Sequence, residues 1–200
     1  MRVVEQLWVF DFNARQAAKP CSRIFTRSAE SIHNPDARRF CVPGDLLFTL
    51  VLVKFGLSRQ MEFRFTNMVG ADTPLKFSEA DNGEIHVSDD SGKCYLQVVR
   101  SGDMTRDKTV VEGFARCYVA FSGKNFPHYL KPLMEQHGVM FNPKRPLVIY
   151  DSMGFCLERL DGFSPNLALT ESSLDVQGKR ADALLEFSIE SAGEAVGCRL

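Results

Sequence analysis

Hydrophobic and polar residues alternate in several short stretches of the first half, which is the pattern of half-buried β-strands. Residues 61–66 show the alternation most clearly, and residues 6–12 are apolar on both faces. Residues 84–87 and 94–100 are further short strands, bounded by turn-forming clusters such as Asp81-Asn82-Gly83. The first half is therefore predicted to be β-rich and to contain a meander.

Two other stretches of the first half have a less definite pattern. The apolar run at residues 46–55 fits a buried strand, and it equally fits a short helix that is capped by Asp45 and ended by Gly56. Residues 13–39 are polar and rich in arginine, with two prolines and little periodicity, so we expect a loop-rich or weakly helical segment there.

The second half predicts a more regular order of elements. Residues 114–121 are expected to be a strand, residues 125–138 a helix that Pro132 kinks or restarts, and residues 146–150 and 155–160 a hairpin. Residues 181–191 fit a helix better than a strand, although Leu185, Phe187 and Ile189 also alternate as in a strand. The resulting order, strand, helix, strand, strand, helix, strand, is the ferredoxin-like pattern. A strand at 181–191 would instead favour a β-rich sandwich.

Length and charge limit the classes of function. The 200 residues, 44% of them hydrophobic, suffice for one large domain or two small ones, and we predict a boundary between residues 1–112 and 113–200. A net charge of -1 counts against nucleic-acid binding as a default. Residues 15–64, however, hold nine basic and four acidic residues. This surplus fits a binding site for a polyanion, and it fits equally well an uneven surface charge that has no partner.

The cysteines and the apolar runs bear on metals, redox state and membranes. None of the six cysteines lies in a Cys-x-x-Cys motif, so no metal is expected, and their aromatic and aliphatic neighbours predict buried free thiols. The run at residues 46–53 is too short to span a bilayer, and residues 1–12 lack the pattern of a signal peptide. We therefore expect a cytoplasmic protein with no membrane partner and no cofactor.

Residues 126–200 combine this order of elements with four short motifs. These are a leucine-containing helix from Tyr129-Leu130 to Gly138, the strand Leu174-Asp175-Val176, the run Ala-Asp-Ala-Leu-Leu from residue 181, and a glycine-punctuated end at residues 191–200. Together they resemble the C-terminal half of the CRISPR-associated repeat-processing endoribonucleases, members of the RAMP superfamily that cut precursor CRISPR RNA. The end of the chain has fewer glycines than the glycine-rich loop of that family, and the first half of the chain does not align with the family.

The resemblance implies an α+β fold of tandem ferredoxin-like (RRM-like) RAMP domains, with a β-rich N-terminal half. It also implies CRISPR repeat RNA as the partner, possible contacts with other subunits of a CRISPR ribonucleoprotein complex, and metal-independent cleavage that leaves a 2′,3′-cyclic phosphate. In such cleavage a base and an acid move protons while cations stabilise the phosphorane.

Histidine and arginine supply the groups that this chemistry needs. His33 lies in the basic segment and is the candidate catalytic histidine, with Arg23 and Arg38 as catalytic phosphate contacts. The candidate RNA-binding residues are Arg27, Arg39, Lys179, Arg180, Gly193, Gly197 and Arg199. Two alternatives remain open: a non-catalytic RAMP backbone subunit, and a β-rich structural or interaction module, which the many short strands and sixteen phenylalanines favour.

Overall fold

One antiparallel sheet organises the described part of the chain. The computed structural model describes residues 4–11, 41–140, 148–161, 164–191 and 193–197. Within these ranges the strand order is β3-β4-β5-β2-β6-β1-β8-β7, and β9 pairs with β8 beside this path. The strands are β1 (Val4–Asp11), β2 (Leu57–Phe65), β3 (Lys76–Glu79), β4 (Ile85–Ser88), β5 (Cys94–Thr105), β6 (Val148–Cys156), β7 (Pro165–Gln177), β8 (Arg180–Ser191) and β9 (Glu194–Ala195).

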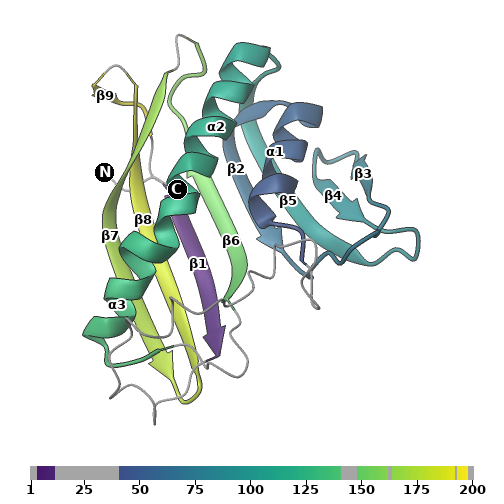
Figure 1. Cartoon of the computed structure of the whole chain (residues 1–200). Helices are drawn as coiled ribbons and strands as arrows, with labels where there is room; N and C mark the ends of the chain where they lie inside the picture. The colour runs from purple at the N-terminus through teal and green to yellow at the C-terminus, as the bar shows by residue number, and fades with distance from the viewer. Residues whose placement is uncertain (1–3, 12–40, 141–147, 162–163, 192, 198–200) are drawn as a thin grey trace.

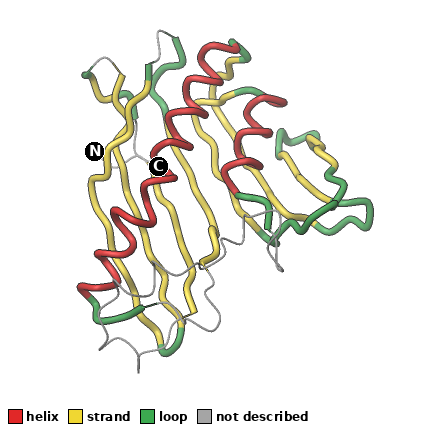
Figure 2. Tube along the Cα trace, in the orientation of Figure 1, coloured by secondary structure: helices red, strands yellow, loops and turns green. Residues whose placement is uncertain are grey.

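The helices cross one face of this sheet (Figures 1 and 2). They are α1 (Gly44–Phe55), α2 (Lys108–Asn125) and α3 (Lys131–Gln136), and a π-helical turn at Phe126–Leu130 joins the last two. Aromatic rings fill the space between the helices and the sheet. The ring centroids of Phe48 and Phe63 lie 5.0 Å apart, and those of Phe114 and Phe155 lie 4.7 Å apart. The α+β class predicted from the sequence is confirmed.

The apolar run of the first half is a helix. In α1, Leu47, Phe48, Val51, Leu52 and Phe55 are buried, which is the spacing of a helical face. The helix ends where predicted, since Gly56 takes a positive φ of 92° and donates a hydrogen bond to the carbonyl of Leu52 at 2.8 Å. The strands predicted at residues 61–66, 84–87 and 94–100 are confirmed as β2, β4 and β5, and β3, β4 and β5 form the expected meander. The strand predicted at residues 6–12 is confirmed as β1 as far as Asp11, and residue 12 lies outside the described residues.

The strand predicted at residues 114–121 is wrong, because these residues belong to α2. The buried residues of α2 include Val111, Phe114, Ala115, Tyr118 and Phe121, which recur every three or four positions. This spacing gives one helical face toward the sheet. The helix predicted at residues 125–138 is present as the π-helical turn and α3, with Pro132 in the first turn of α3.

Two further predictions in the second half are wrong. Residues 181–191 form a strand, β8, because every second side chain from Ala181 to Ser191 is buried. The hairpin predicted across residues 151–154 is one continuous strand, β6, in which Gly154 pairs with Glu5 on one side and with Glu62 on the other. The element order predicted for residues 113–200 is therefore not the one that the described residues form.

The sheet contains two similar units that meet at its centre. In the first, α1 leads into β2, and the order outward from the centre is β2, β5, β4, β3. In the second, α2 and α3 lead into β6, and the order is β6, β1, β8, β7. Both units end in a hairpin at the sheet edge, and β1 takes the place in the second unit that β5 has in the first. The predicted domain boundary at residues 112/113 falls within α2.

Candidate functional site

A cavity of about 550 Å³ lies at the N-terminal end of α1. Its walls come from the segment that leads into α1, the first turns of α1, the end of β2 with the residues after it, the turn before β5, the last turn of α2 and the start of β6. The lining residues are Cys41, Val42, Pro43, Gly44, Asp45, Leu47, Phe65, Thr66, Asn67, Met68, Val69, Lys93, Ser122, Ile149 and Tyr150. Nine of these fifteen residues are apolar or glycine, and six have polar side chains, so the cavity combines apolar contacts with polar groups as small-molecule sites do.

Asp45 places a carboxylate in the wall of this cavity. It lies in the first turn of α1, and the hydroxyl of the buried Ser122 on α2 donates a hydrogen bond to its Oδ1 at 3.1 Å. The hydroxyl of Thr49 donates to the backbone carbonyl of Asp45 at 2.8 Å. The carboxylate is therefore held by a neighbouring helix. It was predicted as the cap of α1, but Pro43 occupies the N-cap position and no side chain caps the helix there.

The N-terminus of α1 faces the cavity through Gly44. The first N–H groups of a helix lack partners within the helix, and they carry a partial positive charge. A side chain at residue 44 would collide with two aromatic rings, since a Cβ atom built there lies 2.9 Å from Cδ1 of Tyr150 and 3.2 Å from Cε1 of Phe65. Glycine at this position thus allows the rings of Tyr150 and Phe65 to pack against the start of α1.

Tyr150 forms the wall beside Gly44 and is held firmly. Its ring packs against Phe65 with centroids 4.8 Å apart, and its hydroxyl is hydrogen-bonded to that of Tyr118 on α2. Tyr118 is 1% exposed and packs on Phe48 at 4.5 Å. The site thus contains a carboxylate and a phenol hydroxyl, each oriented by a hydroxyl from α2.

The cysteines differ in state. Cys41, in the cavity wall, is a buried free thiol as predicted, whereas Cys94 and Cys117 are free thiols that are only half-buried. Burial raises the pKa of the Cys41 thiol, so it is protonated and weakly nucleophilic near neutral pH. Cys156 is disulfide-bonded, and the free thiol predicted for it is wrong.

The residues predicted for RNA cleavage do not form a site among the described residues. His33, Arg23, Arg27, Arg38, Arg39 and Arg199 lie outside the described ranges. Lys179 and Arg180 lie at the turn between β7 and β8, whereas Gly193 follows the other end of β8. At about 3.3 Å per residue, the twelve residues of β8 separate these two places by roughly 40 Å. Gly197 is buried and paired with Leu157.

Two other features bear on the class of protein. Among residues 4–11, 41–140, 148–161, 164–191 and 193–197, no group of three His, Cys, Asp or Glu side chains could hold a metal ion. No helix in these ranges has both the length and the apolar character needed to cross a membrane.

Sequence reasoning singled out none of the residues that line the cavity as a site residue. The one local signal was Pro43-Gly44-Asp45 before an apolar run, which was interpreted as turn and cap. Ser122 and Tyr150 come from α2 and β6, and both of these elements were assigned differently from the sequence.

Fold and site together define an α+β protein with a mostly apolar cavity at a helix N-terminus. Comparison with known families gives one match, over residues 5–200, to the family described as "Protein of unknown function (DUF3581)", and the chain belongs to this family. No curated protein and no solved structure matches the chain.

Proposed function

We propose that the chain binds a small apolar carbonyl compound in the α1 cavity and hydrolyses its ester or thioester bond with Asp45 as general base. The observation that carries this proposal is the carboxylate of Asp45, fixed by Ser122 in the wall of a largely apolar cavity. Partial burial of a carboxylate is costly unless the carboxylate is hydrogen-bonded, and Ser122 supplies such a bond to Asp45 at the cavity.

Size and lining support an apolar ligand. A volume of about 550 Å³ lies within the range of sites for small organic molecules. Leu47 and Val69 are 2% exposed, and with Val42 and Ile149 they offer contacts to an acyl chain. The exposed Lys93 and Met68 mark the side that faces solvent.

The helix terminus supports a carbonyl group at the polar end of the ligand. Backbone N–H groups at a helix N-terminus stabilise negative charge, and an oxygen that becomes negative during reaction benefits most. No side chain caps this terminus, since Pro43 occupies the N-cap position of α1.

The reaction follows from these two groups. Asp45 takes a proton from a water molecule, and the water oxygen forms a bond to the carbonyl carbon. The electron pair of the C=O bond moves to the oxygen at the helix terminus. When the tetrahedral intermediate collapses, the bond to the alcohol or thiol breaks, and the proton on Asp45 passes to the leaving group. The products are a carboxylic acid and an alcohol or thiol.

A structural explanation of Asp45 exists and can be tested. A carboxylate in the first turn of a helix stabilises it by about 0.3–1 kcal/mol, with no catalytic role. Asp45→Asn keeps the shape of the side chain and removes the base. We expect it to lower kcat for hydrolysis of p-nitrophenyl butyrate by roughly a hundredfold or more, since general bases contribute about 10²–10⁴.

The matched control is Asp103→Asn, at a carboxylate on β5 that is 88% exposed. This variant should hydrolyse the ester like the unaltered protein. Equal rates for Asp45→Asn and the unaltered protein would reject Asp45 as the base, and the absence of saturable hydrolysis across acetate, butyrate and octanoate esters and thioesters would reject the function.

Cleavage of CRISPR repeat RNA by tandem ferredoxin-like RAMP domains stays a prediction. Its catalytic residues lie outside the described ranges, and the strand β8 stands where a helix was expected, which favours the non-catalytic β-rich alternative. Incubation with repeat RNA in EDTA, beside His33→Ala, tests it. Cutting that the variant loses would support the endoribonuclease, and binding without cutting would support a scaffold subunit.

A further inference from the structure

A second pocket, of about 420 Å³, lies on the face of the sheet opposite the helices. Along β2 the buried Met61 and Phe63 alternate with the exposed Glu62 and Arg64. Since Phe63 packs on Phe48 of α1, Glu62 and Arg64 point away from the helices. The residues that line this sheet pocket are Glu62, Phe63, Arg64, Glu84, Gln97, Val99, Ser152, Met153 and Gly154. The sheet pocket is therefore separate from the α1 cavity.

One row of the sheet pocket centres on an arginine. Arg64 pairs with Gln97 on β5 and with Ser152 on β6, so the three side chains lie next to one another across the sheet. Within the ranges that the structure describes, the guanidinium of Arg64 has no ion pair. A guanidinium beside an amide and a hydroxyl supplies several hydrogen-bond donors, which suits a carboxylate.

A second row places a carboxylate on each side of an apolar surface. Glu62 pairs with Val99 on β5, and Glu84 directly precedes Ile85, which pairs with Val98. Glu84 thus lies beside Val99 on the side away from Glu62. These two glutamates are two strand spacings apart, or about 9–10 Å at the backbone. Val99 is 51% exposed, so its isopropyl group is open to a ligand between the two carboxylates.

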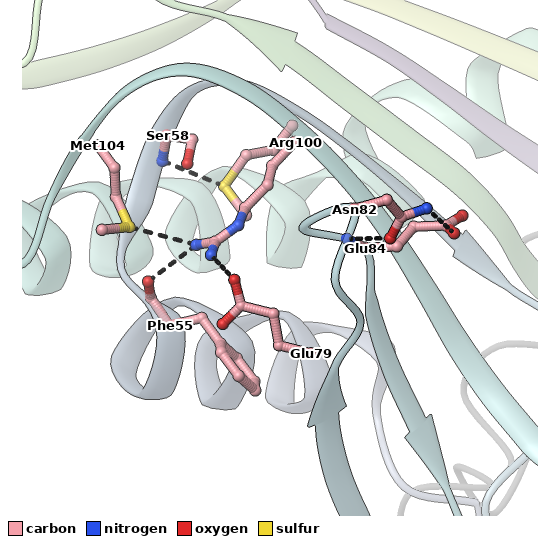
Figure 3. A network of polar contacts seen from close by, with 8 residues as sticks. Phe55, Ser58, Glu79, Asn82, Glu84, Arg100 and Met104 are labelled. Carbon is pink, nitrogen blue, oxygen red and sulfur yellow. Dashed lines mark hydrogen bonds and ion pairs between the residues drawn. The ribbon is translucent and has the colours of Figure 1, made fainter.

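Both carboxylates can accept a cation. Nδ2 of Asn82 donates to Oε2 of Glu84 at 3.1 Å, and Nε2 of His86 lies 3.8 Å from the same oxygen (Figure 3 shows Asn82 and Glu84). These contacts orient Glu84 through Oε2. Glu62 has no ion pair in the described part of the chain, and its partner on β6 is Gly154. A glycine inside a strand often marks a place where a ligand approaches closely.

We propose that the sheet pocket binds a free basic amino acid of the lysine type. Such a ligand carries one carboxylate and two cationic groups, and the pocket offers one guanidinium and two carboxylates. The α-carboxylate binds Arg64, and the α-ammonium binds Glu62. The four-carbon stem lies over Val99, and the side-chain ammonium reaches Glu84. This inference goes beyond the proposed hydrolysis and does not depend on it.

The first test compares ligands by isothermal titration calorimetry with the unaltered protein. Lysine should bind saturably at one site. Each of three analogues lacks one charged group: norleucine lacks the side-chain ammonium, 6-aminohexanoate the α-ammonium, and 1,5-diaminopentane the carboxylate. We expect each analogue to bind at least roughly tenfold more weakly than lysine, because each loses a hydrogen-bonded charge pair.

The second test matches variants to these ligands. Arg64→Gln should weaken lysine at least roughly tenfold and leave 1,5-diaminopentane unchanged, since that ligand has no carboxylate. Glu84→Gln should weaken lysine to a similar extent and leave norleucine unchanged. The controls are Arg116→Gln and Glu112→Gln, at an exposed ion pair on α2 on the other side of the sheet, and both should bind lysine like the unaltered protein.

The outcomes decide both the site and the ligand. Weaker lysine binding in Arg64→Gln and Glu84→Gln, with unchanged controls, would support the inference. It would be overturned if the unaltered protein showed no saturable binding of lysine into the millimolar range, or if all four variants bound lysine equally. Norleucine that binds as tightly as lysine would reject the basic amino acid as the ligand.

Discussion

A single arginine holds the C-terminal end of the helix that carries Asp45. Nη1 of Arg100 on β5 donates a hydrogen bond to the carbonyl of Phe55, the last residue of α1, at 3.0 Å, and Nη2 forms an ion pair with Glu79 (Figure 3). The side chain of Arg100 is 12% exposed, against 36% for Glu79. The guanidinium therefore acts on the negative end of the helix dipole from a mostly buried position.

The change Arg100→Met tests how much this contact stabilises the fold. A hydrogen bond from a charged donor contributes about 1.5–3 kcal/mol, and a cation at a helix C-terminus about 0.3–1 kcal/mol. Methionine keeps much of the apolar stem, and Glu79 can regain water because it is partly exposed. We therefore expect the free energy of unfolding to fall by about 2–3 kcal/mol.

Urea unfolding followed by circular dichroism measures this loss. The control is Arg116→Met on α2, where an arginine that is 82% exposed lies 3.9 Å from Glu112 and should contribute less than about 1 kcal/mol. If the two variants lose the same stability, the contact of Arg100 with Phe55 does not fix the end of α1, and the reasoning fails.

Three further predictions address the core, the acid response and the cavity. Phe187→Ala should lower the free energy of unfolding by about 3–5 kcal/mol in urea, because Phe187 is fully buried on β8. Hydrogen bonds, of which the one from Ser91 has the largest effect, lower the pKa of Asp89 to about 2. The stability that the Asp89 carboxylate contributes is therefore present above pH 4 and is lost as the pH falls toward 2. NMR titration should give that pKa, and Asp89→Asn should weaken the loss of stability in acid. If the cavity binds a ketone, excess 2-octanone should slow the alkylation of Cys41, which lies in the cavity wall, and leave the alkylation of Cys117 unchanged. Mass spectrometry of the labelled peptides measures both rates. Equal rates for Cys41 with and without the ketone would show that the cavity stays empty.

The strands of the first half could be predicted because local signals bound them. Turn residues on both sides of β4, the second set of them directly before β5, mark where pairing stops, and Gly83 and Gly92 there take positive φ angles. Gly56 ended α1 for the same reason, since its φ of 92° disfavours other residues. In each case the decisive conformation lies within a few residues of the signal.

The errors in the second half arose where two periodicities fit one stretch. Residues 114–121 are apolar enough for a strand, and only their packing against the sheet selects the helical spacing of α2. Ala181 and Leu185 are four residues apart, as on a helix, but Ala183 between them is also buried, which a helical face would not require. Pairing of β8 with β1 and β7 selects the strand conformation for residues 181–191, and much of this pairing is with residues distant in sequence.

The cavity depends on the same long-range packing. Ser122 and Tyr150 meet the start of α1 because α2 lies beside α1 and because β6 pairs with β2 at the centre of the sheet. The spacing of these residues along the chain therefore does not predict that they line one cavity.

The N-termini of α1 and α2 differ in how their backbone N–H groups are satisfied. At α2, Oδ1 of Asp107 accepts hydrogen bonds from the backbone N–H groups of Thr109 at 2.8 Å and Val110 at 3.1 Å, so its own chain satisfies that terminus. At α1, proline occupies the N-cap position without a side-chain hydrogen bond, and the nearby carboxylate of Asp45 is held by Ser122 instead. The stability that a cap would give α1 is offset by its apolar surface and by Arg100 at its other end. A helix secured in this way can leave its N-terminus to a ligand.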